Sequence, residues 1–136
     1  MDGQSLDALG QWSREDWQAF AAGLRPDGRM VTGGRRVEAA GGEEIDSIDP
    51  AGGRPVARIA RGGQRDVDAA VSAARASHAS GAWARIAPRE RAAVMYRWAD
   101  LIERNAAELC ALDTMEMGRP IADMIEYDIP EVLNTI

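Results

Sequence analysis

Cys110 and His78 are the only residues of their kinds in this 136-residue chain. A catalytic thiol needs a pKa lowered by a helix N-terminus or a neighbouring cation. Cys110 lies instead in an apolar helical segment close to Glu108. We therefore predict that it packs in the core, as free cysteines commonly do. His78 extends an apolar stripe that begins at Val67, which predicts a partly buried structural histidine rather than a base or a zinc ligand.

Glu116 is an acidic residue at an unfavourable position. It is expected just before Gly118, which should end its helix. A carboxylate near a helix C-terminus opposes the helix dipole by about 0.3–1 kcal/mol. Solvation, pairing with Arg119 or a bound cation would each relieve this cost, and the residue pattern leaves all of these alternatives open.

Paired glycines are the other feature that could do chemistry, because glycine-rich loops hold phosphates. The pairs are Gly33-Gly34, Gly41-Gly42, Gly52-Gly53 and Gly62-Gly63. None has the spacing of a P-loop or of the GxGxxG motif of dinucleotide-binding proteins. The pattern predicts turns between strands and one helix entry.

The elements that would position these residues begin with a helix and two hairpins. Ser13 and Asp16 have the spacing of a capping box, and Trp17 begins the apolar face of the helix that follows. Glycines then separate short strand-like runs. The predicted strand pairs are 30–32 with 36–38, and 44–48 with 56–60.

Helices dominate the second half of the sequence. The first carries the small-residue stripe from Val67 and the second begins at Pro88. We expect Trp98 to lie in a buried face and to matter more for stability than Trp12, which precedes the first cap. The expected buried face comprises Val94, Met95, Trp98, Leu101 and Ile102. A third helix should end at Gly118, and a last helix from Ile121 should be interrupted or kinked at Pro130.

Composition and charge exclude several classes of protein. The net charge of −6 argues against a nucleic-acid partner, which would need a basic patch. No apolar stretch approaches the roughly 20 residues of a membrane span, and the N-terminus lacks a signal peptide. A single cysteine cannot form an internal disulfide. We expect a cytoplasmic protein.

Several segments occur in an order and at distances that resemble the N-terminal region of the aldehyde dehydrogenase family. They are Asp49-Pro50-Ala51-Gly52-Gly53, the stretch 65–71, Pro88-Arg89-Glu90-Arg91, the stretch 98–103, and Thr114 to Ile121. The lead-in with Trp17, and later Asp128-Ile129-Pro130, most resemble the γ-glutamyl-γ-aminobutyraldehyde dehydrogenase-like subfamily. His78, Asp113, Glu116 and Arg119 depart from residues common in the family.

The resemblance implies an α/β fold. The chain would be the N-terminal helical and β-hairpin part of the aldehyde dehydrogenase cofactor-binding domain, truncated because the apolar stripe at Val132, Leu133 and Ile136 has no cap. Residues 1–28 would be a helical lead-in, and residues 29–136 an incomplete domain.

The resemblance also implies NAD(P)-dependent oxidation of an aldehyde to a carboxylic acid by the full-length protein, which would be a homo-oligomer. The catalytic and cofactor-binding residues of the family lie downstream, so none is expected here. A monovalent cation, K⁺ or Na⁺, would be held by the Glu116 carboxylate and the Ile48 carbonyl. The alternative is a non-catalytic helical binding or regulatory module derived from this region.

Overall fold

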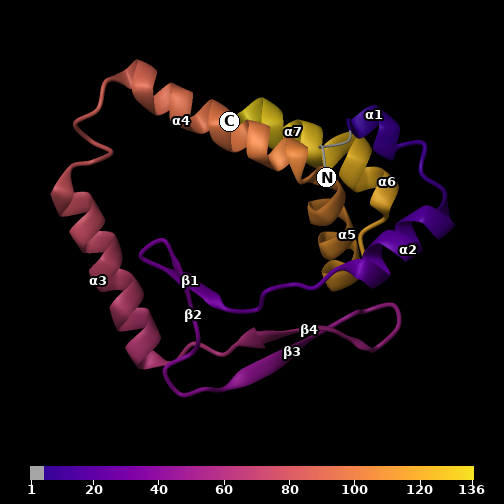
Figure 1. Cartoon of the computed structure of the whole chain (residues 1–136), viewed down its shortest axis with the longest axis horizontal. Helices are drawn as coiled ribbons and strands as arrows, with labels where there is room; N and C mark the ends of the chain where they lie inside the picture. Colours follow the sequence, from indigo (N-terminus) through magenta and orange to yellow (C-terminus); the bar gives the residue numbers. More distant parts are fainter. Residues whose placement is uncertain (1–4) are drawn as a thin grey trace. The chain divides into compact units, whose positions relative to one another are not determined.

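The computed structural model describes residues 5–136, which divide into two compact units. The helical unit comprises the described residues up to Arg25 together with Asp49–Arg54 and Ala92–Ile136. The hairpin unit comprises Pro26–Ile48 and Pro55–Arg91. Figure 1 labels the α-helices and the strands of both units. The chain leaves and re-enters each unit, so segments far apart in the sequence build a common core.

The helical unit begins with two short helices, α1 (Leu6–Leu9) and α2 (Arg14–Gly23). The capping box predicted for α2 is confirmed. The Asp16 amide donates to Ser13 Oγ at 3.2 Å, and the Ser13 amide donates to Asp16 Oδ2 at 2.9 Å. Both bonds satisfy amides that the first helical turn leaves without a partner. They fix the start of α2, which packs against α5.

The remaining helices of this unit are α4 (Pro88–Arg104), whose first turn belongs to the hairpin unit, α5 (Ala106–Met117), α6 (Ile121–Asp123) and α7 (Ile129–Thr135). The core contains side chains from α1, α2, α5 and the C-terminal segment. Leu9 and Cys110 are its largest fully buried side chains. The buried cluster is Leu9, Trp17, Ala106, Cys110, Ala111, Met124, Ile125 and Ile129. The N-terminal helices are therefore part of this core and not an appendage to it.

A π-helix, η1 (Met124–Asp128), lies between α6 and α7. Pro130 explains it, since proline has no N–H to donate to the carbonyl four residues earlier and its ring clashes with that carbonyl. The Ile129 amide instead donates to the Met124 carbonyl, five residues back. Arg119 Nη2 also donates to Asp128 Oδ1 at 3.0 Å, and Arg119 Nε is ion-paired with Asp128 Oδ2. The predicted interruption is thus confirmed, but it is spread over five residues before the proline.

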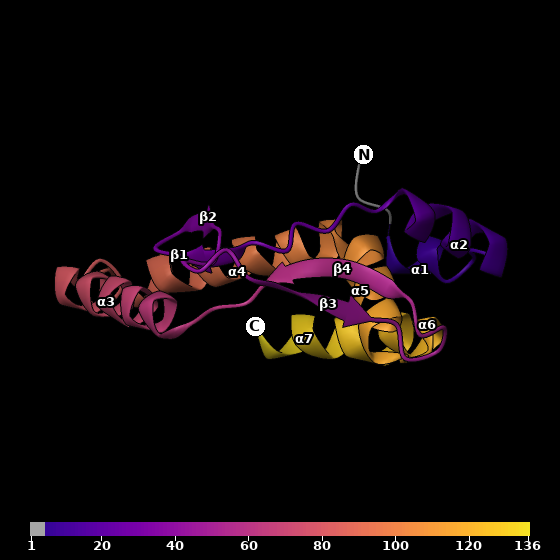
Figure 2. The same cartoon turned by 90° about the horizontal axis from the view of Figure 1, so that it is seen from below.

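The hairpin unit contains two antiparallel strand pairs, which Figure 2 shows from below. Strand β1 (Met30–Thr32) pairs with β2 (Arg35–Val37), and β3 (Glu44–Ile48) pairs with β4 (Pro55–Ala60). The strands agree with the predicted ranges to within one residue at each end. Gly33 and Gly34 both have positive φ, which the tight turn between β1 and β2 requires. Helix α3 (Gln64–Ser80) follows β4.

The predicted facing of two helices is wrong. Trp98 is 52% exposed, while Trp12 is partly buried and packs against the core. Helical spacing shows that residues share a face, but burial also needs a surface to cover that face. The described residues do not cover the α4 face, of which only Ile102 packs against the core. Other residues of the two predicted faces are likewise exposed, namely Val94 and Leu101 of α4 and Val67, Val71 and His78 of α3.

No helix within residues 5–136 is both long enough and apolar enough to cross a membrane.

Candidate functional site

Cys110 lies in the middle of α5 and is fully buried in the core of the helical unit. Burial raises the pKa of its thiol to about 11, and the negative charges of Asp113 and Asp128 act in the same direction. A thiolate is therefore disfavoured at Cys110, and the predicted packing role is confirmed.

We expect the native Cys110 thiol to resist alkylating reagents at pH 8 and to react rapidly once urea unfolds the chain. The pKa of the Cys110 thiol in the folded chain is raised above the ordinary value of 9.0. The protonated thiol therefore makes its full contribution to the free energy of unfolding below about pH 9. That contribution is lost as the pH rises toward about 11. Thiol labelling across a urea series measures the protection. Rapid labelling without urea would contradict the buried position, and Cys110→Ser provides the thiol-free control.

Glu116 and Ile48 belong to different compact units. Ile48 is the last residue of β3, next to an irregularity in the pairing with β4. Glu116 is an exposed residue of the last turn of α5. Arg119, which the sequence offered as a partner for Glu116, binds Asp128. The shared cation site of Glu116 and Ile48 stays a prediction.

Gly118 ends α5 in the left-handed conformation, with φ of 76°, and its amide donates to the Thr114 carbonyl at 3.0 Å. A Cβ atom at this position would lie 3.0 Å from Cγ of Pro50. The turn after β3 therefore packs closely on the end of α5 within the helical unit. Two of the sequence segments that carried the family resemblance, 49–53 and 114–121, meet at this glycine.

Gly62 and Gly63 stand between β4 and α3, which is where a phosphate-binding loop would have to lie. The Asp66 carboxylate already occupies this helix entry. It accepts hydrogen bonds from the Gly63 amide at 2.8 Å and the Ala40 amide at 3.0 Å. These bonds, that from Gly63 first, lower the pKa of Asp66. A carboxylate bound to these amides repels a phosphate. The glycine pair therefore forms the entry to α3, as predicted, and not a phosphate-binding loop.

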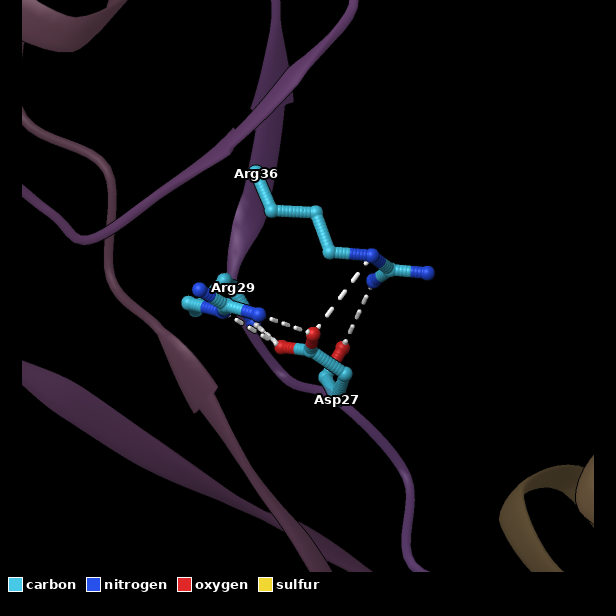
Figure 3. Close-up of polar contacts among 3 residues, drawn as sticks. All are labelled: Asp27, Arg29 and Arg36. Carbon is cyan, nitrogen blue, oxygen red and sulfur yellow. Dashed lines mark hydrogen bonds and ion pairs between the residues drawn. The ribbon is translucent and has the colours of Figure 1, made fainter.

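One ion-pair cluster of the hairpin unit is formed by Asp27, Arg29 and Arg36 (Figure 3). Arg29 Nη2 contacts Asp27 Oδ2 at 2.6 Å, and Arg36 Nε lies 3.4 Å from the same oxygen. Hydrogen bonds from Arg29, with the positive charge of Arg36 contributing less, hold the pKa of Asp27 well below its usual range. A carboxylate so strongly ionised is a poor base, and its role is to tie the segment before β1 to β2.

A cavity of about 420 Å³ lies within the helical unit. Its walls come from α1 and α2 on one side and from α5, α6 and η1 on the other. No pattern in the sequence predicted this cavity, because its two sides are about a hundred residues apart in the chain. Of its lining, the sequence offers only the tryptophans Trp12 and Trp17 as a signal.

Comparison with known proteins identifies the family. Residues 37–136 match the sequence pattern of the family described as "Aldehyde dehydrogenase family". The chain belongs to this family. Among curated relatives, the NADP/NAD-dependent aldehyde dehydrogenase PuuC of Escherichia coli is 38% identical over 120 residues, covering 88% of the chain and 24% of that protein. The chain thus spans about a quarter of the length of this aldehyde dehydrogenase.

Solved aldehyde dehydrogenase structures share the fold of the chain. The γ-glutamyl-γ-aminobutyraldehyde dehydrogenase of Burkholderia cenocepacia matches with a TM-score of 0.86 and 41% identity, over 88% of the chain and 24% of that protein. A mutant of the P. syringae indole-3-acetaldehyde dehydrogenase AldA, in complex with NAD⁺ and IAA, matches with a TM-score of 0.85 and 39% identity, over 93% of the chain and 28% of that protein. The fold is that of the N-terminal helical and hairpin part of the aldehyde dehydrogenase cofactor-binding domain, and the predicted subfamily resemblance is confirmed.

Proposed function

We propose that the chain is part of an NAD(P)-dependent aldehyde dehydrogenase, which oxidises an aldehyde to a carboxylic acid. The family match over residues 37–136 is the observation that carries this proposal. PuuC is described as NADP/NAD-dependent, and AldA is solved with NAD⁺. In this proposal the chain contributes the scaffold of the hairpins and helices, and the reacting groups come from residues outside it.

Within residues 5–136, the glycine turns and helix entries do not fit a nicotinamide cofactor, which would accept a hydride from the substrate. The glycines of these turns lie at hairpins and helix ends, and Asp66 occupies the amides of the strand-to-helix turn at Gly63. Cys110 does not fit the role of a nucleophile either, because it is buried and its pKa is raised. We therefore propose that the 136-residue chain alone is inactive.

The partners in this proposal are a small-molecule aldehyde and further copies of the full-length enzyme. A reducing compartment such as the cytoplasm suits the one cysteine of the sequence, which is unpaired and buried. No nucleic-acid partner is proposed, because the net charge is −6.

A chimaera with PuuC tests the proposal, since the two sequences align over 120 residues. The matching segment of PuuC is replaced by this chain, and NAD(P)H formation is followed with a panel of aldehydes. We expect turnover by the chimaera and none by the chain alone or by PuuC lacking the segment. A folded chimaera that binds cofactor but oxidises no aldehyde would favour the alternative, a non-catalytic helical module derived from this region.

The cation site of Glu116 and Ile48 is proposed with the same enzyme. An ion that binds only the folded state stabilises it by mass action, and it would offset the unfavourable carboxylate at the end of α5. We expect the melting temperature of the chimaera to rise more with K⁺ or Na⁺ than with tetramethylammonium at equal ionic strength. Glu116→Gln should remove this difference, whereas Glu103→Gln on α4 should keep it. An unchanged ion dependence in Glu116→Gln would refute the site.

A further inference from the structure

Helix α4 has an apolar arc that is wider than the part of it that the chain covers. At 100° per residue, the arc from Leu101 round to Ala99 spans about 160° of the helix surface. Met95 and Ala99, on one side of this arc, are half-buried, and Ile102 beside them packs against the core of the helical unit. A helix that packs on a single layer typically has an apolar stripe of about 100°. The width of the arc therefore indicates a second layer.

The other side of the arc is left open by residues 5–136. Val94, Trp98 and Leu101 lie within about 60° of one another around the helix, and they are between 38% and 55% exposed. They are one turn apart along the helix and form one continuous surface, the open face of α4. Single apolar side chains on a surface are ordinary, but a contiguous apolar face marks a surface on which another protein layer packs.

The relatives of the chain contain the residues that such a layer requires. The Burkholderia cenocepacia enzyme shares the fold over 88% of the chain, yet this match takes up only 24% of that protein. The segment of PuuC that matches the chain is likewise 24% of PuuC. About three quarters of each relative's length therefore lies outside the part that α4 and its neighbours represent.

We propose that the open face of α4 is the surface on which the remainder of the aldehyde dehydrogenase packs, through an apolar layer that covers Val94, Trp98 and Leu101. This inference rests on the proposed function. In the whole enzyme α4 is then an internal helix, between the core of the helical unit on one side and the remainder on the other. Removal of the Trp98 ring from water stabilises this contact.

The chimaera with PuuC tests the proposal without any substitution. Hydroxyl-radical footprinting read by mass spectrometry reports the solvent exposure of single aromatic side chains. Trp98 should be oxidised in the 136-residue chain and protected in the chimaera. Tyr96 is the internal control, because it lies on the opposite side of α4 and is 66% exposed, so it should be oxidised in both. Equal oxidation of Trp98 in the chain and in a folded chimaera would overturn the proposal.

A pair of substitutions tests whether the contact stabilises the enzyme. Trp98→Asp should lower the melting temperature of the chimaera by about 5 °C or more, because it places a charge in a buried apolar contact. Tyr96→Asp is the matched control and should change it by only about 1 °C. In the chain alone the two variants should melt alike, since both side chains are exposed there. Equal effects of the two variants in the chimaera would refute the contact.

The remaining outcomes separate this inference from the proposed activity. Protection of Trp98 in a chimaera that oxidises no aldehyde would support the packing surface and contradict the dehydrogenase activity. A chimaera that does not fold would contradict the packing surface, because the chain would then fail to join the remainder of PuuC. If Trp98→Asp leaves the melting temperature unchanged and instead separates subunits in sedimentation, a second copy covers the open face and the proposal fails.

Discussion

Replacing Trp17 by alanine is expected to lower the free energy of unfolding by about 3–5 kcal/mol, the usual cost of removing a core aromatic side chain. Trp17 is 8% exposed and belongs to the buried cluster with Leu9 and Cys110. It also contacts Trp12, at 4.6 Å between ring centroids. The substitution would empty the side of the core where α2 meets α5. Urea unfolding followed by circular dichroism measures the loss.

Trp98→Ala is the matched control. This side chain is 52% exposed in the chain, and surface substitutions stay within about 0.5 kcal/mol. The two variants remove the same side chain, so the difference between their urea midpoints reports burial alone. Equal midpoints would show that Trp17 does not stabilise the core, or that the exposed face of α4 is covered in solution.

Gly28→Ala is the second substitution with a large expected effect, about 3 kcal/mol of destabilisation from overpacking against backbone. A Cβ atom at Gly28 would lie 1.8 Å from the carbonyl oxygen of Arg58. The Gly28 carbonyl also accepts a hydrogen bond from the Ala60 amide at 2.8 Å. The added methyl group must therefore push the chain away from β4 and break this bond. Thermal unfolding and amide exchange at Ala60 measure both consequences.

Gly23→Ala should change stability in the opposite direction. Gly23 ends α2, and nothing lies within 4 Å of the position that its Cβ would take. Alanine there would stabilise the helix by about 0.5–1 kcal/mol, because it restricts the unfolded chain. If both glycine variants lost stability, the contact between Gly28 and β4 would not be the cause.

Local chemistry made much of this fold predictable. The capping box of Ser13 and Asp16, the glycines of the first hairpin turn and the helix end at Gly118 each depend on residues a few positions apart. The burial of Cys110 also followed from its immediate neighbours. Such features depend only on residues within one helical turn or one strand pair. They can therefore be predicted from the sequence alone.

The facing of helices was less predictable, because it depends on what lies across from them. Trp98 and Trp17 both sit on apolar helical faces, yet only Trp17 is buried. The cavity escaped prediction for a related reason. Its walls come from segments at opposite ends of the chain, and only the contact of the first helices with α5, α6 and η1 forms it. The sequence predicted the family, but not this cavity.

The π-helix η1 has a consequence for how helix phase is inferred from sequence. Ile121, Ile125, Ile129 and Leu133 are four residues apart, and all contribute to or pack against the core. In an uninterrupted α-helix, residues at this spacing rotate by about 40° at each step and leave a common face. A π-turn takes up one additional residue, which returns the later side chains to the same side. The segment therefore behaves as an α-helix with a single-residue insertion, and its amphipathic pattern is recovered only when that residue is skipped.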